Sequence, residues 1–564
     1  MNTDFDVIVI GSGMSGGWAA KEFCEKGFKT LVIERGKDVK HIKDYPTAWK
    51  NPWDFEYKGY LPKETTNKNP VVSRCYAFNE ATEHFFVKDN EHPYKQVKPF
   101  DWIRGYQVGG KSLMWARQVQ RWSKNEFISS SRDKYAIPWP IGYDDLSNWY
   151  SRVESFIGVA GNKDGLEEAP DGEFLKPWEM NAVEKYIQKR IKENFNGRTP
   201  VISRTAHLTE MKDQFIKQGR TQCQARTLCE RGCPLGGYYS STSSTLPWAE
   251  KTGNLTLLTD SIVEKIIYDE KLGKAKGVQI INRLSKKTQT ITARCIFVNA
   301  ATINTNLVLL NSTSNRFPNG LGNDNGLLGR YISFHNYRGK VNAKFNGFKN
   351  SYYSGRRPAS IMMPTFRNRN SQDMDFKGGY MVFYSASRDN WWRETNQLKG
   401  AQYGNEFIDD ISKPGSWSIY MMMQGENIPI YSNHVRLGKE MDDYGIPIIE
   451  ISVDYTKNDE LMIKDFLSEG KKMLERAGCK DINPYDTKQA PGLDIHEVGG
   501  ARMGDDPNKS ILNKWNQMHL CSNVFVADGA CMTTSGTKNP SLTFMAITAR
   551  AANFAAEQLK NKKI

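Results

Sequence analysis

The stretch DVIVIGSGMSGGWAAKEFCEKGFKTLVIE, residues 6–34, decides the fold. Asp6–Ile10 is a continuous apolar, β-branched run typical of a buried parallel strand, and Thr30–Glu34 is a second one. Between them lie a glycine turn and an amphipathic segment that stops at Gly27. Strand, glycine turn, helix and a strand that ends in an acid together predict one Rossmann βαβ unit.

Each glycine of this turn has a separate predicted task. Gly11 makes the tight turn, Gly13 lets the backbone approach a pyrophosphate, and Gly16 lets the helix pack on the strand. Glu34 is placed to accept hydrogen bonds from an adenosine ribose. The unit therefore predicts a dinucleotide site, although this pattern alone does not separate FAD from NAD.

Composition and charge narrow the class of protein. The chain has 564 residues, which at about 150 residues per domain allows two to four domains. A mean hydropathy of −0.61 and the lack of any apolar run near about 20 residues exclude an integral membrane protein. The net charge is +14, from 77 Lys and Arg against 63 Asp and Glu, and no arginine-rich arm concentrates it in one segment. It favours docking to an acidic protein over nucleic-acid binding.

The rest of the chain predicts an α/β fold, α+β overall, in which a Rossmann-type nucleotide-binding domain carries an inserted β-rich domain. Residues 1–335 form the first part, with an irregular covering segment at about 40–105 and a cysteine loop at about 220–236. Residues 336–484 form the β-rich substrate domain, and residues 485–564 return to the first. A second glycine turn, QVGGKSLMWAR at 107–117, is predicted to enter a helix. Further predicted elements are a three-stranded meander (255–259, 262–268, 275–281), a strand at 295–300, and helices at 304–310, 458–478 and 542–559.

Several blocks, in this order, make the chain resemble the glucose–methanol–choline (GMC) family of FAD-dependent oxidoreductases. They are GSGMSG with IERG, VGGKSLMW (108–115), GLGNDNGLLGRYISFH (320–335), GENIPIYSNHVRL (425–437) with DYGIP (443–447), IHEVGGARMG (495–504), VADGA (526–530) and GTKNPSLTFMAITARAA (536–552). The resemblance covers nearly the whole chain and implies the FAD-binding fold of that family.

The resemblance also implies roles for single residues. His496 matches the histidine that takes the hydroxyl proton, and Asn539 matches its polar partner. Members with covalently attached flavin carry His where Met114 stands here, so FAD is expected to be bound non-covalently. The implied FAD-binding residues are Gly11, Gly13, Met14, Ser15, Gly16, Glu34, Gly109, Gly110, Trp115, Val263, Asp528, Gly529, Pro540 and Ser541.

Three cysteines form the most discriminating local pattern, Cys223-x5-Cys229-x3-Cys233-Pro234. Three thiolates on one tight loop suit an iron–sulfur cluster, whereas a structural zinc ion needs four ligands. One alternative is a zinc ion whose fourth ligand is Cys75 or His207, and the other is a loop of free cysteines that binds no metal. The spacing resembles the 3Fe–4S site of the dehydrogenase branch of the GMC family.

The resemblance implies oxidation of an alcohol group of a sugar or glycoside, with hydride passing to flavin N5 and the proton to His496. Electrons would leave through a 3Fe–4S cluster to an acceptor such as cytochrome c. The chain most resembles the glucoside 3-dehydrogenases, whose relatives work with a small export subunit. The expected location is therefore the periplasm by co-export, because no signal peptide precedes the first strand. A cytoplasmic location is the alternative.

Two other functions remain open at this point. A pyranose-oxidase-like enzyme would use O2, and a flavin-bearing electron-transfer subunit would have no turnover of its own. Aromatic side chains of the β-rich part could stack on sugar rings, although most are expected to be sheet core: Tyr380, Trp391, Trp392, Tyr403, Trp417 and Tyr420. The other histidines, including His335, have no partner in the sequence pattern and receive no predicted role.

Overall fold

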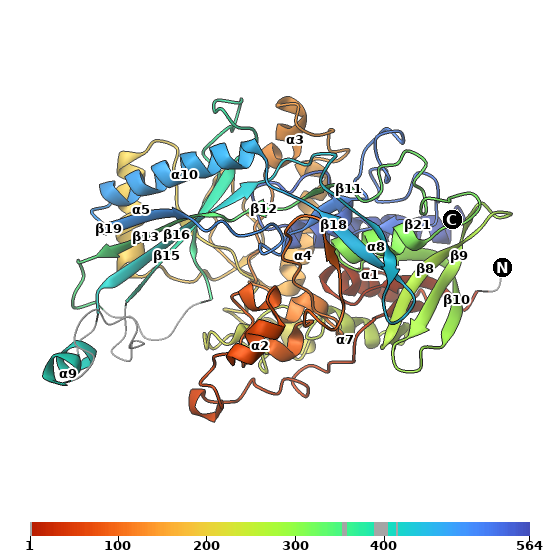
Figure 1. The fold of residues 1–564 in the computed structure, drawn as a ribbon, viewed down its shortest axis with the longest axis horizontal. Coiled ribbons are helices and arrows are strands. Elements are labelled where there is room, and N and C mark those ends of the chain that lie inside the picture. Colours follow the sequence, from red (N-terminus) through yellow and green to blue (C-terminus); the bar gives the residue numbers. More distant parts are fainter. Residues whose placement is uncertain (1–2, 352–357, 389–403, 413–414) are drawn as a thin grey trace.

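The computed structural model describes residues 3–351, 358–388, 404–412 and 415–564. Strands of the described residues form three large sheets and one small sheet made by β4 (Val159–Ala160) and β5 (Phe174–Leu175). Figure 1 shows the sheet with β13, β15 and β16 at one end of the molecule, and β8, β9 and β10 near both chain termini at the other. Helices and sheets mix throughout, which confirms the predicted α/β fold class.

The nucleotide-binding sheet has the parallel strand order β7-β2-β1-β10-β21. The strands are Leu255–Leu258, Thr30–Ile33, Phe5–Ile10, Thr288–Val298 and Val524–Val526. Helices α1 (Met14–Glu25) and α11 (Ser541–Lys560) pack on one face, where Val7, Phe23 and Ala555 share one apolar cluster. Both faces of β1 are buried, which explains its continuous apolar run.

The predicted meander is partly wrong. The antiparallel meander consists of β8 (Ser261–Asp269), β9 (Lys274–Asn282) and the first half of β10. β7 instead pairs in parallel with β2. The reason is that β2 is otherwise an edge strand, and β7 satisfies its unpaired backbone groups.

The sheet farthest from the termini has the order β19-β13-β16-β15-β14-β6, with β12 added beside β16. Helices α10 (Lys457–Arg476) and α5 (Ala182–Asn194) pack on one of its faces (Figure 1). A capping box between Thr456 and Asp459 begins α10, and this helix confirms the one predicted at 458–478. The strands are Lys480–Asp486, Gly339–Phe345, Trp417–Glu426, Tyr380–Arg388, Ile361–Met363, Val201–Ile202 and His335–Asn336.

A third sheet connects segments from both predicted parts, in the order β20-β11-β17-β18-β3. The strands are Val498–Gly500, Arg330–Ser333, His434–Met441, Pro447–Ser452 and Lys95–Gln96. β17 and β18 lie within 336–484 but pair with strands from outside that range, whereas β6 and β12 from before residue 336 join the β13 sheet. Chain segments therefore cross between the two predicted parts.

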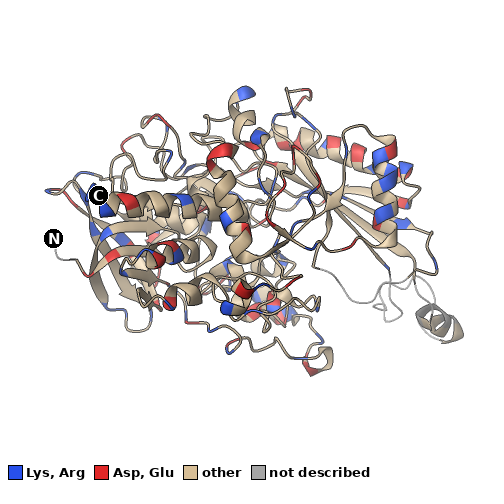
Figure 2. Ribbon diagram, turned by 180° about the vertical axis from the view of Figure 1, so that it is seen from behind, with Lys and Arg blue, Asp and Glu red and all other residues tan. Residues whose placement is uncertain are grey.

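The remaining elements are short or peripheral. Residues 40–105 hold only short helices and β3, in line with the irregular segment predicted there. No helix of the described residues combines the length and the apolar character that crossing a membrane requires. Figure 2 shows basic and acidic residues interspersed over the ribbon. The other helices are α2 (Lys63–Lys68), α3 (Lys124–Arg132), α4 (Tyr143–Ile157), α6 (Asp213–Lys217), α7 (Thr245–Glu250), α8 (Thr302–Asn311) and α9 (Gly404–Ser412).

Candidate active site

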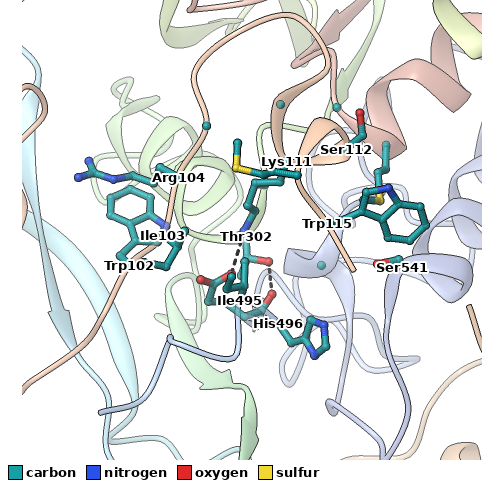
Figure 3. A pocket seen from close by; sticks show the side chains of 18 of the residues that line it. Trp102, Ile103, Arg104, Lys111, Ser112, Trp115, Thr302, Ile495, His496 and Ser541 are labelled. Carbon is teal, nitrogen blue, oxygen red and sulfur yellow. Dashed lines mark hydrogen bonds and ion pairs between the residues drawn. The ribbon is translucent and has the colours of Figure 1, made fainter. Parts of the chain in front are cut away.

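A cavity of about 780 Å³ is lined by residues of the nucleotide-binding sheet and of the β13 sheet. Figure 3 shows Trp102, Ile103 and Arg104 on one side of it and Trp115 and Ser541 on the other. The predicted residues Gly16 and Gly109 do not line it. The predicted site residues that line the cavity are Gly11, Gly13, Met14, Ser15, Glu34, Gly110, Trp115, Val263, His496, Asp528, Gly529, Asn539, Pro540 and Ser541.

The first glycine turn has the geometry of a phosphate cradle. A Cβ on Gly11 would lie 2.4 Å from the Asn299 carbonyl oxygen, and one on Gly16 would lie 1.9 Å from the Gly11 carbonyl oxygen. A Cβ on Gly13 would meet nothing within 4 Å. The outer glycines are thus needed by the chain itself, while the middle one borders open space at the N-terminus of α1. Such a helix start binds anionic phosphate.

Asn299 supports the fit to a polar ligand. The residue lines the cavity, and both polar atoms of its side-chain amide are buried without a hydrogen-bond partner among the described residues. A buried amide without partners is costly unless a ligand or water satisfies it. Together with the glycine turn, this supports the predicted binding of FAD.

Glu34 joins the two glycine turns. Its carboxylate accepts the Ser12 hydroxyl at 2.6 Å and the Gly36 N–H at 2.9 Å, and Ser12 Oγ in turn accepts the Gly109 N–H at 3.0 Å. Burial raises the pKa of Glu34, although these hydrogen bonds oppose the rise. The ribose contact of Glu34 stays a prediction.

The second glycine turn leads into a single 3₁₀ turn, η4 (Gly110–Leu113), and not into the longer helix that the sequence predicted. Gly109 and Gly110 have φ of +93° and +49°, and such left-handed positions do not continue an α-helix. Trp115 follows at the cavity wall and donates its indole N–H to the Tyr239 carbonyl at 3.0 Å.

Asp528 and Gly529 lie at the end of β21 and begin the 3₁₀ helix η7 (Gly529–Cys531). The buried Asp528 carboxylate accepts the Thr305 hydroxyl at 2.6 Å and the Ala530 N–H at 2.9 Å. Burial raises the pKa of Asp528 to about 6. A Cβ on Gly529 would lie 2.5 Å from Thr302 Oγ1, so the backbone approaches α8 closely here.

His496 and Asn539, the predicted catalytic pair, both line the cavity. Burial, helped by the nearby His335 and Lys111, holds the pKa of His496 well below its ordinary value, so the imidazole is neutral near pH 7. The side-chain oxygen of Asn539 is buried and has no partner among the described residues. The site therefore places a neutral base and a polar amide on the lining of one cavity.

Two residues that sequence reasoning missed support His496. His335 Nδ1 lies 2.9 Å from His496 Nδ1. The Asp494 carboxylate accepts the backbone N–H groups of His335 at 2.9 Å and of His496 at 3.2 Å. Burial raises the pKa of Asp494 to about 7. The sequence offered only a weak indication of these two roles. His335 is the last residue of the quoted block 320–335, and Asp494 precedes His496 by two residues.

These three side chains are also the one set among the described residues whose potential metal-ligand atoms all lie within 4.8 Å of one another. The two imidazoles already contact each other at hydrogen-bond distance, and Asp494 already accepts backbone N–H groups. The cluster is therefore satisfied without an ion.

A buried ion pair underlies the loop that carries Asn539. Lys538 Nζ pairs with Glu126, with side-chain exposures of 0% and 1%. The same carboxylate accepts the Thr537 hydroxyl at 2.7 Å and the Ser123 N–H at 2.6 Å. This loop is thereby fixed to the start of α3.

The β13 sheet turns its second face to the cavity. Lys340 pairs with Met422 and Met422 with Phe383, while Tyr420 pairs with Ser385, so these side chains share one face. All five line the cavity. Tyr420 thus lies where a sugar ring could reach it, whereas Tyr380 and Trp417 are core, and Trp391, Trp392 and Tyr403 lie outside the described residues.

The cysteine loop lies beside the cavity wall but does not line the cavity. Cys229 is buried, Cys223 and Cys233 are half-buried, and their sulfur atoms do not all lie within 4.8 Å of one another. His207 Nε2 is 3.6 Å from Cys229 Sγ. Donors around one tetrahedral zinc ion would be about 3.8 Å apart, so these three cysteines are not gathered as the ligands of a single ion.

Arg117 connects this loop to the cavity. Its guanidinium lines the cavity and pairs with Glu230 at 2.7 Å, next to Cys229. Burial raises the pKa of the Cys229 thiol to about 12, and the charge of Arg117 opposes that rise. A cation at this place favours thiolate ligands.

Comparison with known proteins shows the family of the chain. A family model described as GMC oxidoreductase matches residues 6–335 and a second matches residues 429–548. The fructose dehydrogenase large subunit of Gluconobacter japonicus is 25% identical over 98% of both chains. Paromamine 6'-oxidase of Streptomyces fradiae is 24% identical over 99% of this chain and 92% of the relative. The gluconate 2-dehydrogenase flavoprotein of Pantoea cypripedii is 22% identical over 99% and 94%.

The solved structures support the fold alone. Formate oxidase of Aspergillus oryzae superposes with a TM-score of 0.62 at 12% identity, covering 99% of both chains. Pyridoxine 4-oxidase of Mesorbium loti superposes with a TM-score of 0.59 at 16% identity, covering 97% of this chain and 98% of that one.

Proposed function

Because the chain belongs to the GMC oxidoreductase family and is an FAD-dependent oxidoreductase acting on CH–OH groups, we propose that it is a sugar or glycoside dehydrogenase. One observation carries the proposal. His496, neutral near pH 7, and Asn539, with a vacant acceptor oxygen, line the same cavity as the glycine turns. The neutral imidazole can accept the proton of a substrate hydroxyl, and the amide N–H₂ of Asn539 can donate to the oxygen of that hydroxyl.

The chemistry of this chain's residues follows from that pair. Asn539 orients the substrate hydroxyl, and His496 takes its proton as the C–H bond breaks. FAD, when bound by the two glycine turns, Val263, Asp528 and Gly529, would accept the hydride from that carbon. Trp115 and the neighbouring lining residues keep water from the reacting carbon.

The β13 sheet supports a polyhydroxylated substrate. Lys340, Ser385 and the Tyr420 hydroxyl offer polar groups along one wall, and the aromatic faces of Tyr420 and Phe383 can stack on a sugar ring. Relatives named for fructose, gluconate and paromamine support a carbohydrate substrate class. The likeness to glucoside 3-dehydrogenases adds a specific expectation, oxidation at carbon 3 of a glycoside.

We infer further that Cys223, Cys229 and Cys233 would hold a 3Fe–4S cluster, which would supply a one-electron route from the reduced flavin to an acceptor such as cytochrome c. Three cysteines on one loop and the cation of Arg117 support this assignment. A cluster of several iron and sulfide ions spaces its ligands more widely than one ion does. The relative named a large subunit supports a small partner subunit, and export with that subunit would bring the protein to the periplasm.

The test uses the purified, FAD-loaded protein under anaerobic conditions. Bleaching of the flavin spectrum by members of a sugar and glycoside panel is expected, with turnover of an artificial dye. A 3Fe–4S signal in the electron paramagnetic resonance spectrum of the ferricyanide-oxidised protein is expected beside the flavin. Stoichiometric oxygen uptake without an iron signal would instead favour the oxidase function. The similarity to paromamine 6'-oxidase is the reason to test for it.

If no sugar bleaches the flavin, the non-catalytic electron-transfer function is favoured. Cell fractionation with an antibody tests location, because a cytoplasmic pool alone would contradict co-export.

A further inference from the structure

We propose that His335 is a positioning residue that fixes the tautomer of His496, so that Nε2 of His496 presents its lone pair to the substrate hydroxyl. The inference rests on the proposed function, in which His496 takes the hydroxyl proton. It assigns a task to a histidine that the sequence pattern left without one.

The argument begins at the far end of a hydrogen-bond chain. His335 lies on β12 and is fully buried, and its Nε2 is 2.9 Å from the Gly536 carbonyl oxygen. A carbonyl oxygen only accepts, so His335 Nε2 carries a hydrogen and donates it. Burial lowers the pKa of His335 to about 4, so near pH 7 the ring is neutral and has one N–H. His335 Nδ1 is therefore a bare acceptor.

The next contact then has one possible direction. His335 Nδ1 and His496 Nδ1 are 2.9 Å apart, a hydrogen-bond distance that requires one donor. Since His335 Nδ1 has no hydrogen, His496 Nδ1 must carry one. His496 is also neutral near pH 7, so its single hydrogen is used there and its Nε2 holds a lone pair.

The lone pair is available for chemistry. His496 lines the cavity, and its Nε2 has no hydrogen bond to any residue within the described ranges. With the other tautomer, Nε2 would carry a hydrogen and could not accept a proton. The fixed tautomer thus decides whether the base is competent.

The two histidines share one backbone anchor. Asp494 accepts the backbone N–H of each, which holds them together although His335 lies on β12 and His496 lies in the loop before β20. The other titratable groups that act on this cluster are Lys111, Glu497, Tyr337 and Tyr455. When His496 gains the substrate proton it still donates from Nδ1 to His335, so the chain of hydrogen bonds needs no rearrangement.

Two substitutions at His335 separate this role from simple packing. In His335→Gln, the amide oxygen can accept from His496 Nδ1 while the amide N–H₂ donates to the Gly536 carbonyl, so both bonds are retained without an ionisable ring. In His335→Leu both bonds are lost. His434→Leu is the matched control, because His434 lies outside the cavity and bonds only the nearby Ser432 carbonyl.

The first readout needs no substrate. The chain has eight histidines, so ¹⁵N-histidine labelling of the FAD-loaded protein resolves few rings, and His496→Gln identifies the His496 signals. The expected His496 spectrum at pH 7.5 shows a protonated Nδ1 and an unprotonated Nε2 in the wild type and in His335→Gln. A mixture of tautomers is expected in His335→Leu. A protonated Nε2 in the wild type would overturn the inference.

The second readout is flavin reduction by a sugar of the panel in anaerobic stopped flow. His335→Leu should lower the limiting rate roughly 100-fold, a typical share of general-base catalysis, with little change in substrate KM. His335→Gln and His434→Leu should stay within about threefold of the wild type. Equal rates in His335→Leu and the wild type, or equally slow Leu and Gln variants, would refute the role.

The outcomes distinguish the two levels of inference. If no sugar reduces the wild-type flavin, the proposed function fails, while the nitrogen spectra still decide the tautomer. If His335→Leu does not retain FAD, His335→Asn gives the same comparison, because its shorter amide cannot reach both partners.

Discussion

Replacing Lys538 by Met should destabilise the protein strongly, because it leaves the Glu126 carboxylate buried without its cation. The two side chains are 0% and 1% exposed, and the lost ion pair sits beneath the loop that carries Asn539. Removing one partner of a buried pair costs about 3–5 kcal/mol. The hydrogen bonds from Thr537 and Ser123 remain and offset part of that cost, so the lower end, about 3 kcal/mol, is expected.

The assay is urea unfolding of the FAD-loaded protein, followed by tryptophan and flavin fluorescence. Two controls make it decisive. Lys471→Met removes a pair with Glu475 in which both side chains are about half exposed, and it should cost less than about 1 kcal/mol. The double variant Glu126→Gln/Lys538→Met removes the stranded charge and should recover about 2 kcal/mol relative to Lys538→Met. A Lys538→Met cost no larger than that of Lys471→Met would refute the reasoning.

Four further predictions concern the reaction. His496→Ala should keep FAD bound but slow flavin reduction by substrate by roughly 100-fold or more, measured by anaerobic stopped flow; unchanged kinetics would contradict the base. Flavin reduction should rise with pH through about 7, where the Asp494 carboxylate forms and stabilises protonated His496, and Asp494→Asn should flatten that rise. Cys229→Ser should leave flavin bleaching intact but stop cytochrome c reduction, and normal cytochrome reduction would exclude the relay. Lys340→Met should raise the KM for gluconate, which carries a carboxylate, several-fold, and it should raise the KM for the uncharged sorbitol less. Equal increases for both substrates would argue against a contact between Lys340 and the substrate.

The fold elements that the sequence predicted well depend on short-range patterns. β1, α1 and β2 follow from one apolar run, three glycines and a second run, all within 29 residues (6–34). The positions of Gly11 and Gly16 are imposed by backbone approaches under 2.5 Å. The elements predicted less well depend on pairing across the chain. β7 was assigned to a meander because β8 follows it closely, but the edge of β2, more than 200 residues earlier, is its partner.

The site shows the same division. His496, Asn539 and the glycine turns carry family motifs, so their positions in the sequence indicate their place in the cavity. The proposed role of His335 depends on its contact with His496, which lies 161 positions away, and no local sequence pattern shows that contact. Which of the two imidazoles donates to the other depends on the carbonyl oxygen of Gly536. The position of a backbone carbonyl cannot be predicted from the side-chain types of the sequence.

The cavity itself explains why so many long-range contacts converge here. Its walls come from the ends of β1 and β2, from β8, from α8, from the β13 sheet and from the loop before α11. Beside this volume of about 780 Å³ the Asn299 amide is buried without a hydrogen-bond partner among the described residues, and a buried polar group of that kind is costly. A cofactor that binds only the assembled junction adds its binding free energy to folding. FAD bound in this cavity would therefore also stabilise the packing of the two parts of the chain against each other.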